Sequence, residues 1–406
     1  MSEFTQNGII STLHDFGTKS TRQIEKELLS FSKERKMELI LPCLYSELNG
    51  EALPKIVSEI AQTNYLHHII IGLDQANEKQ ARKAWTFFEK LETPFTILWN
   101  DGPNLKKLDK ELKKKALAPN EKGKGRNVWY CIGMSIARNS ARSVALHDCD
   151  IKTYDRRMLA KLFYPVVNPL FNFEFCKGYY PRVADNKMNG RVARLLVFPL
   201  LNALEKTIGK SEYLDFMKSF KYPLAGEFSF RRNILPELRI SSDWGIEIGI
   251  LSEMQRNFSP QNICQVDLAD TYDHKHQDLS IDDENKGLSR MSIDIIKTFI
   301  KKLATQGHSF SREELRSLKA TYYRSALDLI DAYRGDAEMN GLKFDSHSEE
   351  KAVELFSKNI IKAGEDFYLN PMDAPFIPTW SRVKSAIPDF LLRLEKAVNE
   401  DNKYYL

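Results

Sequence analysis

The sequence has few cysteines and no long hydrophobic run. Its five cysteines are an odd number among 406 residues, and none forms a CxxC pair, so neither a zinc site nor a disulfide framework is indicated. No window approaches the roughly 18 apolar residues of a membrane-spanning helix. The first residues lack a basic stretch followed by an apolar core, so we expect no signal peptide. These absences predict a cytoplasmic protein.

An excess of charge of one sign is also missing. The chain carries 59 basic and 55 acidic residues, a net charge of +4, which implies no surface for polyanions. The most basic stretch, residues 104–126, is typical of a solvated helix followed by a loop. We therefore expect neither a nucleic-acid partner nor a membrane partner.

Apolar runs alternate with amphipathic helical patterns over the first 150 or so residues. The strand-like runs are 37–47, 67–74, 94–100 and 143–146. This alternation predicts a mostly parallel sheet with helical crossovers. Ligands of such sheets bind beyond the carboxyl ends of the strands. The polar stretches YSELN, GLDQAN and HDCD all fall at that edge, so the edge is the expected place for a site.

Two aspartates, Asp148 and Asp150, follow the last of these runs in the stretch SVALHDCDIKTYDR (143–156). Side chains two residues apart in an extended chain point the same way, so both carboxylates are expected on one face. Like charges this close repel unless a cation or a shared proton relieves them. A hard divalent ion with oxygen ligands is one such relief. A solvated loop beside a helix N-cap explains the same residues without a ligand, so both interpretations stay open here.

Further stretches carry polar residues that folding alone explains poorly. Lys124 stands between two glycines in EKGKGRN, where it can meet a phosphate or be an exposed lysine in a turn. Glu247 lies inside the apolar run DWGIEIGIL, where an unpaired carboxylate is costly unless it sits on a surface face. His274 and His276 share the loop DTYDHKHQ, and can ligate a metal or simply be exposed. The stretch PLAGEFSF (223–230) sets a glycine and a glutamate after an apolar turn.

In this order, these stretches resemble the glucosyl-3-phosphoglycerate synthases, retaining GT-A glycosyltransferases that transfer glucose from a nucleotide sugar to 3-phosphoglycerate. The resemblance runs from about Glu38 to Leu279 and is strongest over NGRVARLLVFPLLNAL, YPLAGEF, DWGIEIGIL and YDHKHQDL. It implies an α/β fold, a Rossmann-like, mostly parallel GT-A catalytic domain with a C-terminal helical extension. The implied product is a precursor of the compatible solute glucosylglycerate.

The expected organisation has four segments. They are an N-terminal helical segment (1–36), a nucleotide-sugar-binding half (37–157), an acceptor-binding half (158–287) and a helical C-terminal extension (288–406). The polar stretch HQDLSIDDENKG marks the last break. The extension is longer than is usual in the family, and we expect it to form a dimer interface or a cover over the active site. A homodimer is the expected assembly.

The resemblance also assigns catalytic and metal-binding residues. Asp148 and Asp150 match the DxD motif, in which carboxylates hold Mg²⁺ or Mn²⁺ against the donor diphosphate, and His274 matches a third metal ligand. Glu247 matches a carboxylate that contacts the transferred sugar. The backbone carbonyl of Leu224 matches one that steadies the developing positive charge on the sugar. Asp150, Glu247 and Leu224 are therefore the implied catalytic residues.

Binding residues follow by the same matching. The implied donor-binding residues are Pro42, Leu44, Glu47, Lys124, Asp148, Cys149 and Glu247. Cys149 is unusual within a DxD motif, but its side chain is expected on the opposite face of the strand. The implied acceptor-binding residues are Gly190, Arg191, Ala193 and His276. Arginine suits the acceptor because its fork matches phosphate and carboxylate geometry.

Two departures from the family pattern leave alternatives open. The family has threonine where Ala193 stands, and a serine-rich turn where this chain has GLDQAN. The donor is therefore UDP-glucose or GDP-glucose, and a related retaining transferase with a mannosyl donor or another small polar acceptor is the second hypothesis. A non-catalytic nucleotide-sugar-binding scaffold is the third. It is disfavoured because the DxD pair and His274 are all present.

Overall fold

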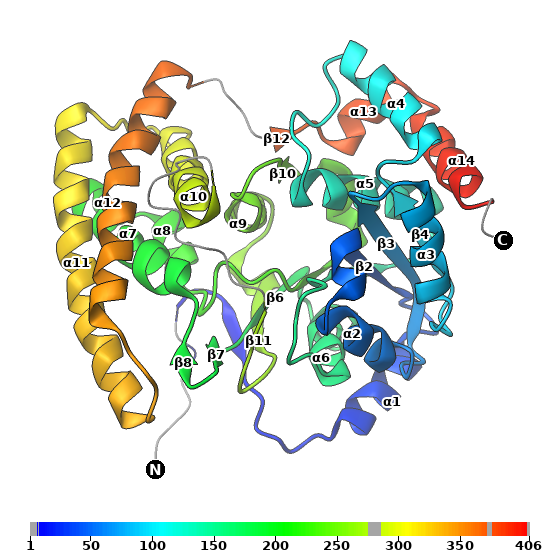
Figure 1. Ribbon diagram of the computed structural model, residues 1–406, viewed down its shortest axis with the longest axis horizontal. Helices are drawn as coiled ribbons and strands as arrows, with labels where there is room; N and C mark the ends of the chain where they lie inside the picture. Colours follow the sequence, from blue (N-terminus) through cyan, green and yellow to red (C-terminus); the bar gives the residue numbers. More distant parts are fainter. Residues whose placement is uncertain (1–5, 7, 275–285, 372–375, 404–406) are drawn as a thin grey trace.

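An eight-stranded sheet forms the centre of the computed structural model, which describes residues 6, 8–274, 286–371 and 376–403 (Figure 1). The strand order is β1-β11-β6-β9-β5-β2-β3-β4. Every neighbouring pair is parallel except the two that β9 makes with β5 and β6. The strands are β1 (Ser11–Leu13), β2 (Met37–Leu44), β3 (Leu66–Asp74), β4 (Phe95–Trp99), β5 (Ser143–Leu146), β6 (Phe175–Tyr179), β9 (Phe228–Arg231) and β11 (Ile263–Asp267). The predicted α/β fold with a mostly parallel sheet is confirmed.

Helices cover both faces of this sheet. Along β2, Ile40 packs into one hydrophobic cluster while Leu39 and Leu41 pack into the other, because strand side chains alternate between faces. The helices on the Leu39 side are α1 (Thr21–Phe31), α2 (Ala52–Ile60), α3 (Glu78–Phe88) and α6 (Arg156–Val167). The helices on the Ile40 side include α4 (Pro103–Lys114), α5 (Lys124–Arg138), α7 (Phe198–Ile208), α8 (Glu212–Lys218) and α9 (Ile246–Asn257). Burial on two faces explains the continuous apolar runs of the central strands.

The central strand β2 contains a proline, Pro42, near its carboxyl end. Pro42 of β2 pairs with Gly72 of β3, but β5 pairs only with the first part of β2, up to Ile40. The missing N–H of Pro42 therefore falls where β2 has already lost one of its neighbours.

The first 36 residues differ from the expected helical segment. Among the residues described there, the structure contains one helix, α1, which begins at a capping box between Ser20 and Gln23. Before it, β1 adds an edge strand to the sheet by pairing Ser11 with Cys264 of β11. A three-residue strand carries too little periodicity to be recognised, and its partner lies about 250 residues away in the sequence.

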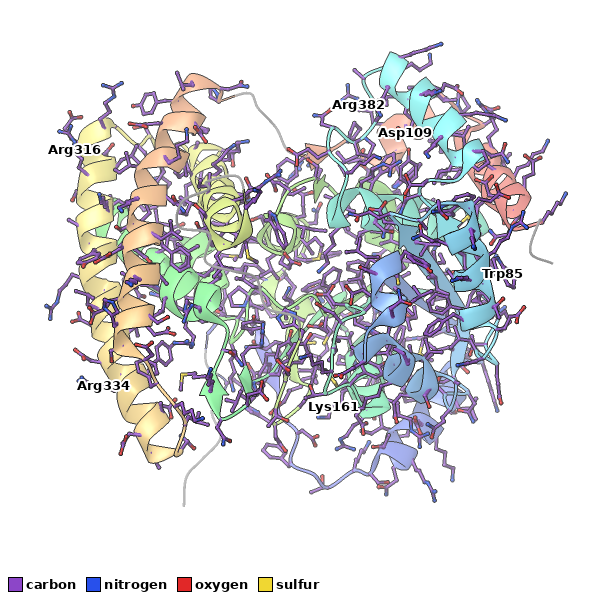
Figure 2. The ribbon with its side chains drawn as sticks, viewed as in Figure 1. Trp85, Asp109, Lys161, Arg316, Arg334 and Arg382 are labelled. Carbon is purple, nitrogen blue, oxygen red and sulfur yellow. The ribbon has the colours of Figure 1, made fainter. Side chains whose placement is uncertain are left out.

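The C-terminal helices are α10 (Gly287–Ala304), α11 (Arg312–Met339), α12 (Ser346–Leu369), α13 (Trp380–Ala386) and α14 (Phe390–Asn402). Figure 1 shows α11 and α12 side by side at one end of the molecule, and α13 and α14 beside α4 at the other. α12 packs on α10 and α11, and α11 packs on α7. Arg316 and Arg334 point outward from α11 (Figure 2).

The end of the chain is anchored on the sheet domain. The rings of Trp380 and Trp129 stack with their centroids 4.0 Å apart. The indole N–H of Trp85, labelled in Figure 2, donates to Asn402 at 2.7 Å. A two-residue strand, β12 (Phe376–Ile377), pairs antiparallel with β10 (Ile240–Ser241). Hydrophobic side chains of the C-terminal helices and of the sheet thus belong to one core cluster.

Candidate active site

The site lies where the strand order reverses direction. The order β5-β2-β3-β4 places β5 and β2 side by side although two strands and their crossovers separate them in the sequence. Crevices at such switch points are the usual ligand sites of open α/β sheets. Asp148 and Asp150 leave the carboxyl end of β5 here. Because β9 is antiparallel to β5, with Phe228 opposite Leu146, the turn that precedes β9 reaches the same edge.

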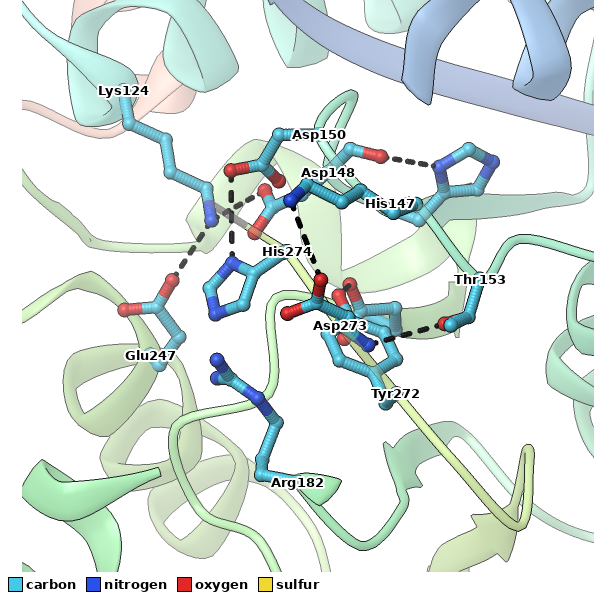
Figure 3. Close-up of polar contacts among 12 residues, drawn as sticks. Lys124, His147, Asp148, Asp150, Thr153, Arg182, Glu247, Tyr272, Asp273 and His274 are labelled. Atoms are coloured by element: carbon cyan, nitrogen blue, oxygen red, sulfur yellow. Dashed lines mark hydrogen bonds and ion pairs between the residues drawn. The ribbon is translucent and has the colours of Figure 1, made fainter. Parts of the chain in front are cut away.

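Three charged residues from three elements meet at this edge (Figure 3). The ammonium group of Lys124, the first residue of α5, lies 2.6 Å from Oδ1 of Asp148 and 3.0 Å from Oε1 of Glu247. Glu247 stands in the first turn of α9, with its side chain 10% exposed. The structure thus brings together the three residues on which the donor-site expectation rests most.

Their charges stabilise one another. Burial alone would raise the pKa of Asp148, but the ammonium group of Lys124 outweighs it and the pKa lies below its ordinary value. Burial opposes the charged form of Lys124 as well, yet the charges of Asp148 and Glu247 raise its pKa. Lys124 therefore stays cationic between two carboxylates across the physiological pH range.

Glycines allow this close approach. A Cβ on Gly226, in the turn before β9, would stand 2.3 Å from Oδ2 of Asp148. A Cβ on Gly125, directly after Lys124, would stand 2.1 Å from the carbonyl oxygen of Ser241. A Cβ on Gly125 would therefore clash with the backbone, and one on Gly226 would displace the carboxylate of Asp148. The stretches GKG and PLAGEF thus serve the same site.

Asp150 faces the histidine loop. Its Oδ2 lies 3.6 Å from Nδ1 of His274, and its Oδ1 is buried without a hydrogen-bond partner among the described residues. The loop is fixed by Asp273, whose N–H donates to the Thr153 hydroxyl and whose carbonyl accepts from Lys152. In the part of the chain that the structure describes, no three His, Cys, Asp or Glu side chains converge as a complete metal site. His276 lies outside the described residues.

Several buried polar residues beneath the site were not predicted. The hydroxyls of Tyr180 and Tyr272 both donate to Glu227, and the two rings stack with centroids 3.6 Å apart. Burial, and then the charge of Asp148, raise the pKa of Glu227. Lys177 donates to the carbonyl oxygen of Ala225, and burial lowers the pKa of its ammonium group to about 8. These contacts fix the turn that carries Gly226 and the loop that carries His274.

The remaining donor-side residues lie at the end of β2. Pro42 is half-buried, Leu44 is the exposed last residue of β2, and Glu47 lies in the 3₁₀ turn η1 (Tyr45–Asn49). Cys149 is buried, and the neighbouring thiol of Cys43 and burial raise its pKa. A buried thiol between two polar aspartates agrees with the expected alternation of faces. A direct contact of Pro42, Leu44, Glu47 or Cys149 with a donor stays a prediction.

A cavity of about 200 Å³ opens beside His274. Its lining residues include Arg182, Gly190, Arg191, His274 and Glu349. Gly190 adopts a φ of 74°, a left-handed conformation that favours glycine. The predicted acceptor residues Gly190 and Arg191 thus face one cavity, next to the predicted metal-binding histidine.

Two other predicted site residues, Ala193 and Leu224, do not line this cavity. Ala193 is buried in a π-helical turn, η2 (Ala193–Val197). Leu224 is half-buried, and within the described residues its carbonyl accepts no hydrogen bond.

Arg182 was missed from the sequence. Figure 3 shows its guanidinium directed toward His274 from below. It donates to the Tyr222 hydroxyl at 3.0 Å and lies 5.5 Å from the ring centre of Tyr272. Its Nε is buried with no hydrogen-bond partner among the described residues. The only sequence signal was the aromatic pair before it, Tyr179 and Tyr180, which is equally typical of a core strand.

Comparison with known proteins identifies the class of this chain as the glycosyltransferases. No protein-family model matches the chain. Among curated proteins, the glucosyl-3-phosphoglycerate synthase of Persephonella marina is 42% identical over 402 residues, 99% of this chain and 99% of its own length. That of Methanococcoides burtonii is 37% identical over 98% of this chain and 97% of its own length. The chain belongs to the glucosyl-3-phosphoglycerate synthase family, and both matches include the C-terminal helices.

Solved structures share the fold at low sequence identity. Glucosyl-3-phosphoglycerate synthase of Mycobacterium tuberculosis, in complex with Mn²⁺, uridine diphosphate and glucosyl-3-phosphoglycerate, superposes with a TM-score of 0.52 and 20% identity. The match covers 73% of this chain and 88% of that chain. Mannosyl-3-phosphoglycerate synthase of Rubrobacter xylanophilus gives a TM-score of 0.54 and 19% identity over 74% and 83% of the two chains.

Proposed function

We propose that this chain transfers glucose from a nucleotide sugar to 3-phosphoglycerate, in a metal-dependent reaction that retains the anomeric configuration. The observation that carries the proposal is the Lys124–Asp148–Glu247 cluster at the switch point, in a chain 42% identical to a curated glucosyl-3-phosphoglycerate synthase. A cationic lysine beside two carboxylates suits a donor that brings a diphosphate and a sugar to the same place.

The residues present fit a divalent cation. Asp150 has a buried carboxylate oxygen with no hydrogen-bond partner among the described residues, and Asp148 and His274 stand beside it. Oxygen ligands with one imidazole suit Mg²⁺ or Mn²⁺. When bound, the cation supplies electrostatic stabilisation to the diphosphate leaving group. In the M. tuberculosis family member, Mn²⁺ is bound together with uridine diphosphate.

Three residues of the chain act on the donor itself. Lys124 places a positive charge against the donor diphosphate and helps to stabilise the charge that develops when the bond to the sugar breaks. Glu247, held by Lys124, accepts hydrogen bonds from sugar hydroxyls. The carbonyl of Leu224 directs its negative end toward the developing positive charge on the sugar. We assign no carboxylate as a covalent nucleophile.

The acceptor is expected in the cavity beside His274. 3-Phosphoglycerate carries a phosphate and a carboxylate, and the cavity presents two guanidinium groups, those of Arg182 and Arg191. Two cations in the lining of one cavity suit an acceptor with two anionic ends. Gly190 lets the backbone N–H groups of its loop approach the phosphate.

Product formation from a panel of donors tests the proposal. UDP-glucose, GDP-glucose and GDP-mannose are each supplied with 3-phosphoglycerate and either Mg²⁺ or Mn²⁺. A phosphorylated glycoside formed from a glucosyl donor supports the proposal and identifies the donor base. Product from GDP-mannose alone would replace it with the mannosyl alternative, and binding of donors without transfer would overturn the assigned acceptor.

Assembly and location complete the proposal. We expect a homodimer, which light scattering on the purified protein tests directly. Within the described residues, no helix combines the length and apolar character that a membrane crossing requires. All five cysteines are buried free thiols, which supports a reducing compartment such as the cytoplasm.

A further inference from the structure

The C-terminal extension reaches the acceptor cavity through the first turn of α12. Glu349, in that turn, lines the cavity together with Arg191, and its side chain is 7% exposed. The turn is held by Asp345, whose side chain caps the N–H of Ser348. Glu349 therefore has a fixed position at the wall of the site.

Glu349 holds one edge of Arg191. Its Oε1 accepts from Nε of Arg191 at 3.1 Å and from Nη2 at 2.9 Å, and Nη2 also donates to the Ser348 hydroxyl at 3.2 Å. Nη1 of Arg191 makes no hydrogen bond in the part of the chain that the structure describes, and the side chain remains 28% exposed. One edge of the guanidinium is thus occupied, and the other is available to the cavity.

The same carboxylate also fixes the backbone of the acceptor loop. Oε2 of Glu349 accepts from Nη2 of Arg194 at 3.1 Å. Arg194 in turn donates to the carbonyl oxygens of Asn189, at 2.9 Å, and Met188, at 3.1 Å. Arg194 lies over the ring of Tyr333 of α11 at 4.9 Å. Glu349 is therefore shared between the loop and its arginine.

A second tie joins the segment before α12 to the same region. The N–H of Lys343 donates to the carbonyl of Asn186 at 2.7 Å, in the hairpin of β7 (Val183–Ala184) and β8 (Lys187–Met188). That hairpin connects Arg182 to the acceptor loop. Residues 343–349 are thus attached to the segment between the two cavity arginines at two places, the hairpin turn at Asn186 and Arg191.

We propose that Glu349 is a positioning residue for acceptor binding, which holds the guanidinium of Arg191 so that its Nη1 edge faces the acceptor. The inference rests on the proposed function and gives the C-terminal extension a role in it. A buried carboxylate between two arginines can also be a purely structural anchor. It can also compete with the anionic acceptor for Arg191. The three roles predict different acceptor kinetics.

The test compares Glu349→Ala and Glu349→Gln with the control Glu350→Gln, an exposed carboxylate one residue further along the same helix. Positioning predicts that Glu349→Ala raises the KM for 3-phosphoglycerate about tenfold while the donor KM stays within about twofold. Glu349→Gln keeps one oxygen for Arg191 and should give a smaller rise. Glu350→Gln should match the wild type. A lowered acceptor KM would establish competition instead.

The Arg191→Ala background separates positioning from a structural anchor. If Glu349 acts through Arg191, adding Glu349→Ala to Arg191→Ala raises the acceptor KM no further. An equal further rise in that background, or a matching change in the donor KM, would overturn the proposal. Circular dichroism verifies that each variant is folded, and if the alanine variant is not, the same comparison is made with Glu349→Gln.

Wild-type turnover in the same assay separates a failure of the proposed function from a failure of the role assigned to Glu349. Without wild-type product from 3-phosphoglycerate, the proposed function fails, and the variants are then compared by calorimetric binding of 3-phosphoglycerate itself. With wild-type turnover, an unchanged acceptor KM in both Glu349 variants refutes the role of Glu349 alone.

Discussion

At the scale of single residues, the site depends on one lysine placed between two acids. Lys124, Asp148 and Glu247 come from the start of α5, the end of β5 and the start of α9, so only the folded sheet edge brings them together. Each charge would be costly to bury alone, and together they leave the cluster with a net charge of −1. Asp150 adds one more negative charge, and a divalent cation at Asp148 and Asp150 would bring the sum to zero, which removes the repulsion of a diphosphate.

Replacement of Lys124 tests this cluster. Lys124→Ala leaves Asp148 and Glu247 without their shared cation, so we expect turnover to fall by about 100-fold or more. The control is Lys122→Ala, because Lys122 lies in the same loop with its side chain 77% exposed. Steady-state kinetics with saturating donor and acceptor measure both variants. If the turnover of Lys124→Ala stays within a few-fold of that of the wild type, Lys124 does not act at the reacting centre.

The sequence predicted these residues better than their supports. Asp148, Asp150 and Lys124 stand in short motifs with glycine or alternating spacing, so the sequence alone marked them as candidates for one site. Tyr180 and Tyr272 look like ordinary core aromatics, and only the fold directs both hydroxyls at Glu227. A buried polar network of this kind depends on contacts between distant segments, which one sequence does not report.

At the scale of elements, the acceptor loop depends on an irregular helix. Residues 189–209 have the pattern of one continuous helix, but in the structure the helix that begins at Arg191 contains the π-helical turn η2 before α7. Such turns are rare and frequently lie at functional sites. Tyr322 of α11 donates to the carbonyl of Leu195 within this turn at 2.6 Å. The C-terminal extension thus satisfies a backbone group of the acceptor region.

Tyr322→Phe tests that contact with almost no change in shape. The variant leaves a buried carbonyl without its donor, so we expect the free energy of unfolding to fall by about 1–2 kcal/mol. Tyr323→Phe is the matched control, since the hydroxyl of Tyr323 makes no hydrogen bond within the described residues. Urea denaturation measures the free energy of unfolding of both variants. Equal midpoints for the two variants would show that the Leu195 carbonyl does not need Tyr322.

Element type was predictable wherever the pattern was long. The four strands β2 to β5 agree with the apolar runs that predicted them, because each run is buried on both faces of one sheet. β1 and the antiparallel insertion of β9 were not predictable. Both arise from pairing with strands far away in the sequence, and neither leaves a local signal.

At the scale of the whole molecule, the C-terminal helices pack against the sheet domain at two separate places. α11 and α12 support the acceptor loop, and α14 packs on α4, α5 and β4 at the other end of the sheet. The curated relatives of P. marina and M. burtonii match along nearly their whole length, so the match includes the C-terminal helices. These helices were predictable from their apolar stripes, but their contacts were not.

The pH dependence of global stability follows from a buried histidine in the sheet. His68 of β3 contacts the Thr96 hydroxyl at 2.9 Å and Nη2 of Arg138 at 3.3 Å. Burial lowers the pKa of His68 from 6.5 to about 3. Between these values the unfolded chain binds a proton that the folded chain does not. Stability is therefore complete above the higher value and falls as the pH drops toward the lower one.

His68→Gln removes that linked proton. Between pH 6.5 and 3, the unfolding free energy of this variant should depend less steeply on pH than that of the wild type, by about the slope that one bound proton contributes. Its stability at neutral pH is lower. His347→Gln, at an exposed histidine, is measured alongside it as the matched substitution. Denaturation series at several pH values measure the slopes, and an unchanged slope in His68→Gln would contradict the assigned linkage.

The central claim is tested most directly by the identity of the product and its dependence on metal. The purified protein is incubated with α-linked UDP-glucose or GDP-glucose, 3-phosphoglycerate and Mn²⁺, and the product is characterised by mass spectrometry and NMR. The account predicts an α-linked glucosyl-3-phosphoglycerate that is lost with EDTA and restored when Mn²⁺ is added back. A β-linked product, formation unaffected by EDTA, or no transfer to 3-phosphoglycerate would contradict it.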